Sequence, residues 1–189
     1  MEEKFKQIAS ANPNCIKVVL YGPESTGKTS LARALAEHYD TVVVEEFSRI
    51  YAQARQNKVL SKADVIPIAI GQMNLENEQL EKANKLLICD TDLLETQVYS
   101  EFYYDGFCPR LVKKYAQKNT YDLYFLTYID TVWKADGIRD LPNQRSQMFI
   151  AFEQALIQAN KPYVTIKGNF EERLNICKAQ IDKLLTPLH

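Results

Sequence analysis

Short apolar runs alternate with longer amphipathic segments along the chain. The apolar runs cover residues 16–21, 41–45, 86–90, 123–128 and 163–167. Each run is short and bounded by polar residues or glycine, and most are rich in β-branched side chains, so each predicts a strand. Strands that are separated by helices form a parallel sheet with helices on both faces. We therefore expect an α/β fold around a five-stranded parallel sheet.

The segments between these runs have the spacing of helices. Apolar residues three and four apart predict helices over residues 29–39, 47–56, 61–84, 93–104, 111–118, 144–160 and 171–185. Ser61 and Asp64 have the spacing of a capping box, and Asn169 is a suitable cap for the last helix. The sequence contains no repeat, low-complexity run or linker, so we expect residues 1–189 to form a single domain.

Polar residues follow every predicted strand. The five segments read GPESTGKT, EEFSR, DTD, YIDTVWKADGIR and GNFEER in chain order. In open parallel sheets, ligands bind beyond the carboxyl ends of the strands. The sequence therefore predicts that these segments meet at one edge of the sheet and form the functional site.

The segment GPESTGKT matches the phosphate-loop pattern G-x-x-x-x-G-K-[ST] without a gap. Its glycines allow the backbone N–H groups to approach phosphate oxygens, Lys28 can reach the β- and γ-phosphates, and the Thr29 hydroxyl can bind Mg²⁺. A chance match in a loop is the alternative, but a strand before the loop and a helix after it are both predicted. We therefore expect ATP to bind through Gly22, Pro23, Glu24, Ser25, Thr26, Gly27, Lys28, Thr29 and Ser30.

Carboxylates follow the second and third predicted strands. Asp90 ends an apolar strand, which is the position of the acid that supports Mg²⁺ in phosphate-loop enzymes; a cap of a helix or turn is the alternative. Asp92 can face the same cleft or cap the helix after it. Glu46 can bind sugar hydroxyls or accept a proton. It can also form an ion pair with Arg49, three residues further along a helix.

Residues 129–147 form a polar segment that contains the chain's single tryptophan. Trp133 in such a segment is a candidate lid over a flat ring, and a cationic ring would be attracted to its face. Arg139 and Arg145 are placed to reach over the phosphates during transfer. The alternative is a loop that Trp133 anchors to the core and whose arginines are solvated.

Composition narrows the range of partners. The formal net charge of −1 gives no overall basic surface, so we expect no nucleic-acid partner. The charged start MEEKFKQ is unlike a signal peptide, and no apolar run reaches the length of a membrane span, so we expect no membrane partner and a cytoplasmic location. Four separated cysteines and two histidines favour reduced thiols over a zinc site. The oligomeric state is not indicated.

The classes of phosphate-loop protein differ in their other motifs. A GTPase would carry N-K-x-D, whereas here Asn160 and Lys161 are followed by Tyr163 at the position of the acid. A motor or an AAA-type ATPase is expected to need a longer chain and a helical lid domain. Five strands, the chain length and an arginine-bearing lid favour a kinase of nucleosides or nucleotides.

Four motifs together resemble the ribosylnicotinamide kinase domain of NadR-type proteins, over essentially the whole chain. They are GPESTGKT, Glu46-x-x-Arg49, DTD at residues 90–92, and D-x-x-W-x-x-D-G-x-R at residues 130–139. The resemblance implies a P-loop kinase fold with a small lid. It also implies ATP-dependent phosphorylation of the ribose 5′-hydroxyl of nicotinamide riboside, which gives nicotinamide mononucleotide in the salvage of NAD.

The resemblance also implies roles for single residues. Trp133 and Asp136 would shape the nicotinamide pocket, and Arg49 would be one of the substrate-binding residues. Arg139, with Arg145, would neutralise charge on the moving phosphoryl group. Glu46 and Asp92 both remain candidates to hold the ribose and receive the proton of its 5′-hydroxyl.

The chain departs from the family at two points. Val132 stands where the family often has proline, and about twenty residues precede the phosphate loop. We therefore do not expect the DNA-binding and adenylyltransferase activities of full-length NadR proteins. Two other functions remain open: a kinase of another nucleoside, and a non-catalytic sensor that binds ATP or NAD.

Overall fold

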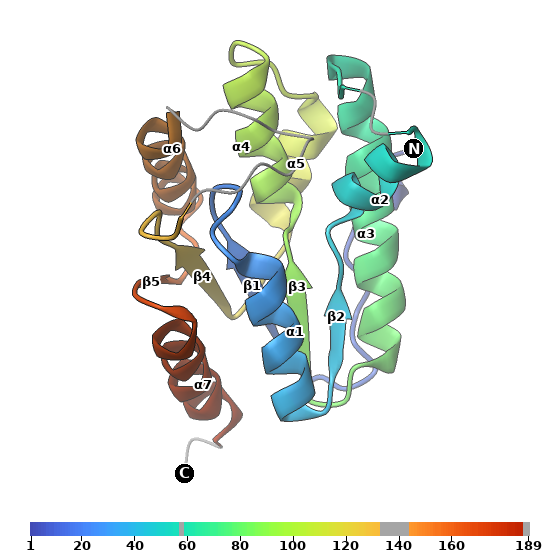
Figure 1. The fold of residues 1–189 in the computed structure, drawn as a ribbon. Coiled ribbons are helices and arrows are strands. Elements are labelled where there is room, and N and C mark those ends of the chain that lie inside the picture. Colours follow the sequence, from blue (N-terminus) through green and yellow to red (C-terminus); the bar gives the residue numbers. More distant parts are fainter. Residues whose placement is uncertain (57–58, 133–143, 187–189) are drawn as a thin grey trace.

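Five parallel strands form one sheet in the order β2-β3-β1-β4-β5 (Figure 1). The computed structural model describes residues 1–56, 59–132 and 144–186. The strands are β1 (Ile16–Tyr21), β2 (Val42–Val44), β3 (Leu86–Asp90), β4 (Leu123–Thr127) and β5 (Tyr163–Ile166). All five predicted strands are present, and the predicted α/β fold with a parallel sheet is confirmed.

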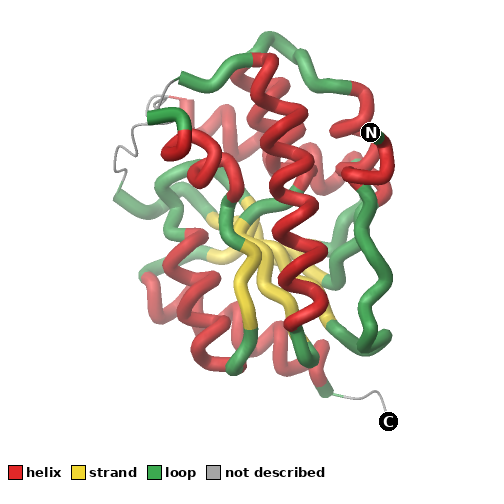
Figure 2. Tube along the Cα trace, turned by 90° about the vertical axis from the view of Figure 1, so that its right-hand side faces the viewer, coloured by secondary structure: helices red, strands yellow, loops and turns green. Residues whose placement is uncertain are grey.

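Helices cover both faces of the sheet (Figures 1 and 2). One face packs on α1 and α7, and the other on α3 to α6. The helices are α1 (Lys28–Tyr39), α2 (Phe47–Ala54), α3 (Val65–Lys82), α4 (Leu93–Tyr103), α5 (Arg110–Lys118), α6 (Arg145–Gln158) and α7 (Phe170–Leu185), with short 3-10 turns η1 (Glu2–Phe5) and η2 (Lys62–Asp64). No helix among these described residues is long and apolar enough to cross a bilayer.

The central strand β1 explains why the apolar runs are nearly continuous. Val18 and Leu20 belong to the core that packs on α1 and α7, whereas Val19 and Tyr21 belong to the core on the opposite face. Alternate residues of a strand point to opposite faces, so a strand that is covered on both sides needs apolar residues throughout. The register pairs Leu20 with Asp90 of β3 and Phe125 of β4, which brings the carboxyl ends of these three strands level.

The starts of several helices follow the predicted caps. The Ser61–Asp64 capping box is present and leads into α3 through η2, and Asn169 forms a capping box at the start of α7. The turn η1 was not predicted from the sequence, because four residues are too few to show a period. Phe5 in this turn is fully buried and stacks on Tyr115, with ring centroids 6.0 Å apart.

Candidate functional site

The phosphate loop connects β1 to α1 and passes close to the end of β4. Gly22 has a φ of +134°, and a Cβ atom there would lie 2.6 Å from Thr127 Oγ1. Gly27 has a φ of +85° and forms the N-cap of α1 in the left-handed conformation. The first glycine is therefore required by space and the second by backbone conformation. Thr26 and Thr127 share a hydrogen bond of 2.6 Å between their hydroxyls, which ties the loop to β4.

Arg173 holds the phosphate loop from the side of α7. Its guanidinium is almost fully buried and donates hydrogen bonds to the backbone carbonyls of Thr26, Gly168 and Tyr128 at 2.8–2.9 Å. It also forms an ion pair with Asp130, and Asp130 accepts a hydrogen bond from Gly168 N at 2.7 Å. The sequence placed Arg173 only in a segment after the last strand. A buried arginine that satisfies three carbonyls fixes the loops after β1, β4 and β5 against one another.

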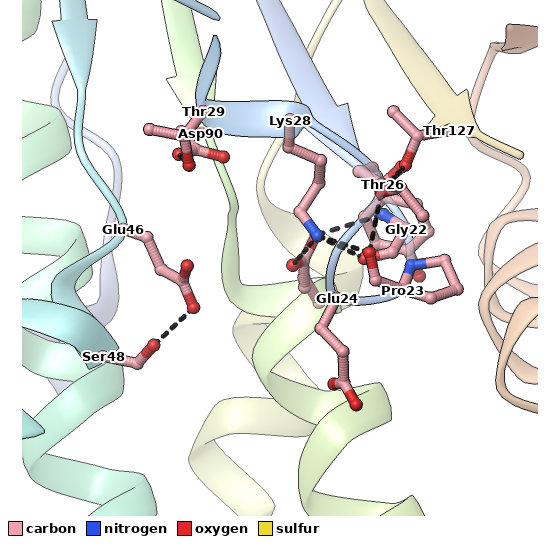
Figure 3. Close-up of polar contacts among 12 residues, drawn as sticks. Gly22, Pro23, Glu24, Thr26, Lys28, Thr29, Glu46, Ser48, Asp90 and Thr127 are labelled. Carbon is pink, nitrogen blue, oxygen red and sulfur yellow. Dashed lines mark hydrogen bonds and ion pairs between the residues drawn. The ribbon is translucent and has the colours of Figure 1, made fainter. Parts of the chain in front are cut away.

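Lys28 lies folded against its own loop, as Figure 3 shows. Its Nζ donates hydrogen bonds to Gly22 O at 2.6 Å and to Pro23 O at 2.9 Å. It also lies 3.3 Å from Oε1 of Glu95 on α4. The lysine therefore stands over the loop at the place where the motif predicts phosphate.

Glu95 is a site residue that the sequence reasoning missed. It is 1% exposed, and its Oε2 accepts a hydrogen bond from Gly22 N–H at 3.2 Å. A weak signal existed, because Asp92-x-x-Glu95 has the spacing of a capping box at the start of a helix. That spacing explains an acid in the first turn without any functional role, and so it does not single out Glu95.

Thr29 and Asp90 lie together, as a metal site requires. The Thr29 hydroxyl donates a hydrogen bond of 2.5 Å to Asp90 Oδ2, while the buried Oδ1 accepts no hydrogen bond from the described residues. Burial, and next the negative charge of Glu46, raise the pKa of Asp90 to about 6. A buried carboxylate oxygen without a donor beside a threonine hydroxyl fits Mg²⁺, which takes its other ligands from phosphate and water.

Metal binding by side chains alone is not supported in the part of the chain that the structure describes. No three His, Cys, Asp or Glu side chains gather there into a site. The donor set of Thr29 and Asp90 therefore fits an ion that arrives with a nucleotide.

Asp92 caps α4 and is fully engaged with the protein. Its Oδ1 accepts a hydrogen bond from Glu95 N at 2.9 Å, and its Oδ2 accepts one from the Tyr124 hydroxyl at 2.7 Å. Burial raises the pKa of this carboxyl group, while these hydrogen bonds act in the opposite direction. Asp92 does not line the cavity that lies between α2, α3 and α4. Its geometry fits the positioning of α4, and with it Glu95.

Glu46 follows β2 and approaches the phosphate loop from the β2–β3 side (Figure 3). Its carboxylate accepts hydrogen bonds from Ser48 Oγ at 2.5 Å and from Arg49 Nε at 2.7 Å. The ion pair with Arg49, which the sequence offered as an alternative role, is therefore present. Glu46 is almost fully buried, yet it also lines a cavity, so the ion pair and a role in ligand binding are compatible.

A cavity of about 330 Å³ opens between α2, α3 and α4. It is lined by both acidic and aromatic side chains: Glu46, Glu95, Tyr99, Tyr103 and Tyr104. The Tyr99 and Tyr103 rings stack with centroids 6.1 Å apart. Ser48, Gln72, Thr91, Thr96 and Ser100 add polar groups to the wall. We call this space the acceptor cavity.

The acceptor cavity adjoins the phosphate loop directly. Glu95 lines the cavity and contacts both Gly22 and Lys28. The Tyr103 hydroxyl donates to the carboxylate of Glu24, a buried residue of the loop, at 3.3 Å. A molecule in the cavity would therefore lie beside Lys28, the side chain for which the motif predicts contact with the terminal phosphate.

Arg145 is the first residue of α6, and Thr131 connects it to the phosphate loop by hydrogen bonds. Its guanidinium donates to Thr131 O at 2.9 Å, and the Thr131 hydroxyl donates to Ser25 O at 2.9 Å. Burial lowers the pKa of Arg145. Trp133, Asp136 and Arg139 lie outside the described residues, so their predicted roles in the lid stay predictions.

Comparison with known proteins gives a family and two curated relatives. A family model described as an AAA domain matches residues 17–173. The trifunctional NAD biosynthesis/regulator protein NadR of Salmonella typhimurium is 29% identical over 168 residues, which cover 87% of this chain and 39% of that protein. Its namesake from Escherichia coli K12 is 31% identical over 66% of this chain and 31% of its own length. The chain thus spans two fifths or less of these relatives.

Solved structures agree on the fold. A NadR protein in complex with NR (nicotinamide riboside) superposes with a TM-score of 0.77 at 21% identity, covering 93% of this chain and 53% of that one. A deoxyadenosine kinase from M. mycoides gives a TM-score of 0.61 at 15% identity, covering 88% and 99%. The P-loop kinase fold and the resemblance to NadR-type proteins are confirmed. From the sequence we expected no AAA-type ATPase, because such a protein would need a longer chain and a helical lid domain. The match to a family described as an AAA domain shows that these grounds do not exclude membership of that family.

Proposed function

Because the chain belongs to the AAA domain family and is homologous to NadR proteins, we propose that it is an ATP-dependent nicotinamide riboside kinase. Residues 1–189 would act as one kinase domain that phosphorylates the ribose 5′-hydroxyl and releases nicotinamide mononucleotide. A kinase role in NAD metabolism agrees with both curated relatives.

The acceptor cavity is the observation that carries this proposal. Its wall combines two buried carboxylates, Glu46 and Glu95, with three tyrosines of α4 and its C-terminal end. The nicotinamide ring of the riboside is a pyridinium cation. Aromatic faces and carboxylates both stabilise a cation that has left water. Arg49 and Lys28 pair with these carboxylates but do not line the cavity, so among the described residues the carboxylates are the charged groups that face it. A cavity of this kind beside the phosphate loop therefore suits nicotinamide riboside better than a neutral nucleoside.

The proposed mechanism is an in-line transfer of the γ-phosphoryl group. The loop amides and Lys28 hold the phosphates of ATP, and Arg145, together with Arg139, offsets charge on the moving group. Glu46 binds the ribose and accepts the proton of the 5′-hydroxyl as that oxygen bonds to phosphorus. The bond from phosphorus to the β-phosphate oxygen breaks, and its electron pair leaves with ADP.

Asp92 takes a different part from Glu46 in this proposal. Both carboxylates accept hydrogen bonds inside the protein, but Glu46 lines the acceptor cavity and Asp92 does not. We therefore assign it to positioning α4 rather than to the proton. Trp133 and Asp136 would shape the pocket of the nicotinamide ring.

Thr29 and Asp90 would hold Mg²⁺ in this site. Bound Mg²⁺ would neutralise phosphate charge and orient the phosphates. The unpartnered Oδ1 of Asp90 supports this assignment, since a buried carboxylate oxygen otherwise lacks a donor.

A kinase of a neutral nucleoside is the second candidate. The fold is similar to those of a deoxyadenosine kinase and of thymidylate kinases, with TM-scores of 0.61 and 0.63 in two examples. These likenesses concern the fold, whereas the charge of the cavity wall favours a cationic acceptor.

Turnover with Mg·ATP and nicotinamide riboside tests the proposal, with nicotinamide mononucleotide measured by mass spectrometry. The expected result is product from wild type and its loss in Asp90→Asn. Trp133→Ala should raise KM for the riboside. Binding of ATP without any product from a panel of nucleosides would instead support a sensor and contradict the proposal.

A further inference from the structure

Glu95 belongs to both halves of the site. One carboxylate oxygen accepts the Gly22 N–H, and the other lies 3.3 Å from Lys28 Nζ. The same side chain lines the acceptor cavity and is 1% exposed. A single buried carboxylate thus contacts the lysine that binds phosphate and faces the space proposed for the acceptor.

Phosphates and Glu95 compete for the same lysine. The structure shows Lys28 paired with Glu95 and hydrogen-bonded to the carbonyls of Gly22 and Pro23. A nucleotide draws Lys28 toward its phosphate oxygens. Glu95 then loses part of its counter-charge while new negative charge arrives beside it. A buried carboxylate that loses one of its partners opposes the event that removes that partner.

An acceptor in the cavity removes this opposition. Its hydroxyl groups can donate hydrogen bonds to Glu95, and a cationic ring adds positive charge to the cavity. We infer that Glu95 couples the two substrates, so that the nucleotide binds more tightly when the acceptor occupies the cavity. The inference rests on the proposed function for the identity of the acceptor.

This coupling has a direct consequence for wasted ATP. In the absence of acceptor, the Glu95–Lys28 pair competes with the nucleotide, so less ATP lies in the site without a hydroxyl to receive its phosphoryl group. Coupling between two ligands is reciprocal, and typical factors are about 5–150. We expect about tenfold tighter nucleotide binding in the presence of acceptor.

Calorimetric titration measures the coupling without catalysis. Mg·AMP-PNP is titrated into the full chain with and without saturating nicotinamide riboside. In wild type, the riboside should lower the nucleotide Kd about tenfold, and the reverse titration should give the same factor. In Glu95→Gln, the nucleotide alone should bind about tenfold more tightly than it does to wild type, and the riboside should change its Kd less than twofold.

Two further variants separate charge from structure. Glu101→Gln removes a carboxylate of the same helix that pairs with Lys113 at 2.7 Å and does not line the acceptor cavity, so it should keep the wild-type coupling. Glu95→Met is a second neutral replacement of similar length, and it should lose the coupling as Glu95→Gln does. Thermal melting checks that each variant is folded.

The outcomes distinguish the two proposals. Binding of the riboside with no coupling in wild type, or with wild-type coupling in both Glu95 variants, overturns the role of Glu95 and leaves the proposed function standing. A wild-type protein that binds the nucleotide but no riboside, at any nucleotide concentration, overturns the proposed function, and the role of Glu95 falls with it.

Discussion

The site has two halves, the phosphate loop and the acceptor cavity, and they differ in whether backbone or side chains form them. The phosphate half consists mainly of backbone from a single loop, which Arg173 and Thr127 hold in place through hydrogen bonds. The acceptor half consists of side chains from α2, α3 and α4 and the segments beside them, with carboxylates and tyrosines in its wall. Backbone amides recognise phosphate whatever is attached to it, whereas side chains can be exchanged without rebuilding the fold. The acceptor half is therefore where this chain should differ from other proteins with the P-loop kinase fold.

Replacement of Lys28 should reduce activity more than replacement of an aromatic side chain in the acceptor cavity. The size of the reduction should be the same whichever nucleoside is the acceptor. Lys28→Met removes the positive charge that we propose stabilises the transferring phosphoryl group, so kcat/KM should fall by about 10²–10³-fold. Lys82→Met, which changes an exposed lysine at the end of α3, serves as the control. Steady-state rates with two different nucleosides would measure this. A defect confined to one of them would place Lys28 in the acceptor half and break the comparison.

Loss of an aromatic ring from the cavity should affect the acceptor alone. Tyr99→Leu keeps apolar bulk but removes an aromatic ring from the cavity wall, and an aromatic ring near a cation is worth about 0.5–2 kcal/mol. KM for nicotinamide riboside should rise about 3–30-fold, while the Kd of Mg·AMP-PNP stays within twofold. Phe102→Leu, three residues further along α4 and outside the acceptor cavity, is the matched control. Equal effects on both ligands would mean that Tyr99 supports the whole site.

The ionised carboxylate of Asp90 should lower the stability of the folded protein, although the proposed metal site needs it. Its pKa is raised to about 6 in the folded protein, chiefly by burial, so the folded state favours the protonated form. Preferential protonation of Asp90 in the folded state contributes to the free energy of unfolding. This contribution is present below about pH 4 and is lost as pH rises through 6. Asp90→Asn should therefore leave stability unchanged near pH 4 and raise it by about 1–3 kcal/mol at pH 7.

Thermal melting of the nucleotide-free protein across this pH range would show the increase in stability of Asp90→Asn. Activity assays should show that the same variant forms no product. Thr29→Val removes the neighbouring hydroxyl without removing a charge, so it should not reproduce the pH-dependent gain. A variant Asp90→Asn that melts lower than wild type at pH 7 would contradict the assignment of a buried, unfavourable charge.

The cap of α7 should have the smallest effect. Asn169 accepts a hydrogen bond from Glu172 N at 3.0 Å, and Asn169→Ala should cost about 1 kcal/mol. For a chain of this size the melting temperature should fall by about 2–4 °C. The kcat should change less than twofold, because Arg173 still holds the phosphate loop. A larger loss of activity would mean that the helix start, and not Arg173 alone, positions this half.

The phosphate half could be predicted from the sequence because its residues are contiguous. Gly22 to Thr29 lie in one motif, and Asp90, at the end of a predicted strand, lies beside Thr29 as the proposed metal site requires. Helix starts were predictable for the same reason, since a cap such as Asn169 lies within four residues of its partner. Local chemistry leaves a local signal.

The acceptor half left no such signal. Tyr99 and Tyr103 are separated by one helical turn on α4, which is also the spacing of an ordinary core helix. Glu46 and Glu95 become neighbours of one cavity only after β2 and α4 take their places around β3. Nothing short of the packed fold brings Glu95 to Lys28, and so the contact between the two halves was missed.

Competition between two ribosides tests the cationic cavity most directly. Nicotinamide riboside and its reduced dihydro form have nearly the same shape, but only the oxidised form carries the ring charge. An equimolar mixture of the two with Mg·ATP gives a product ratio that equals the ratio of kcat/KM. A preference of about tenfold or more for the charged form is predicted, which corresponds to about 1.4 kcal/mol. Equal use of both forms, or a preference for the reduced one, would contradict selection by charge in the acceptor cavity.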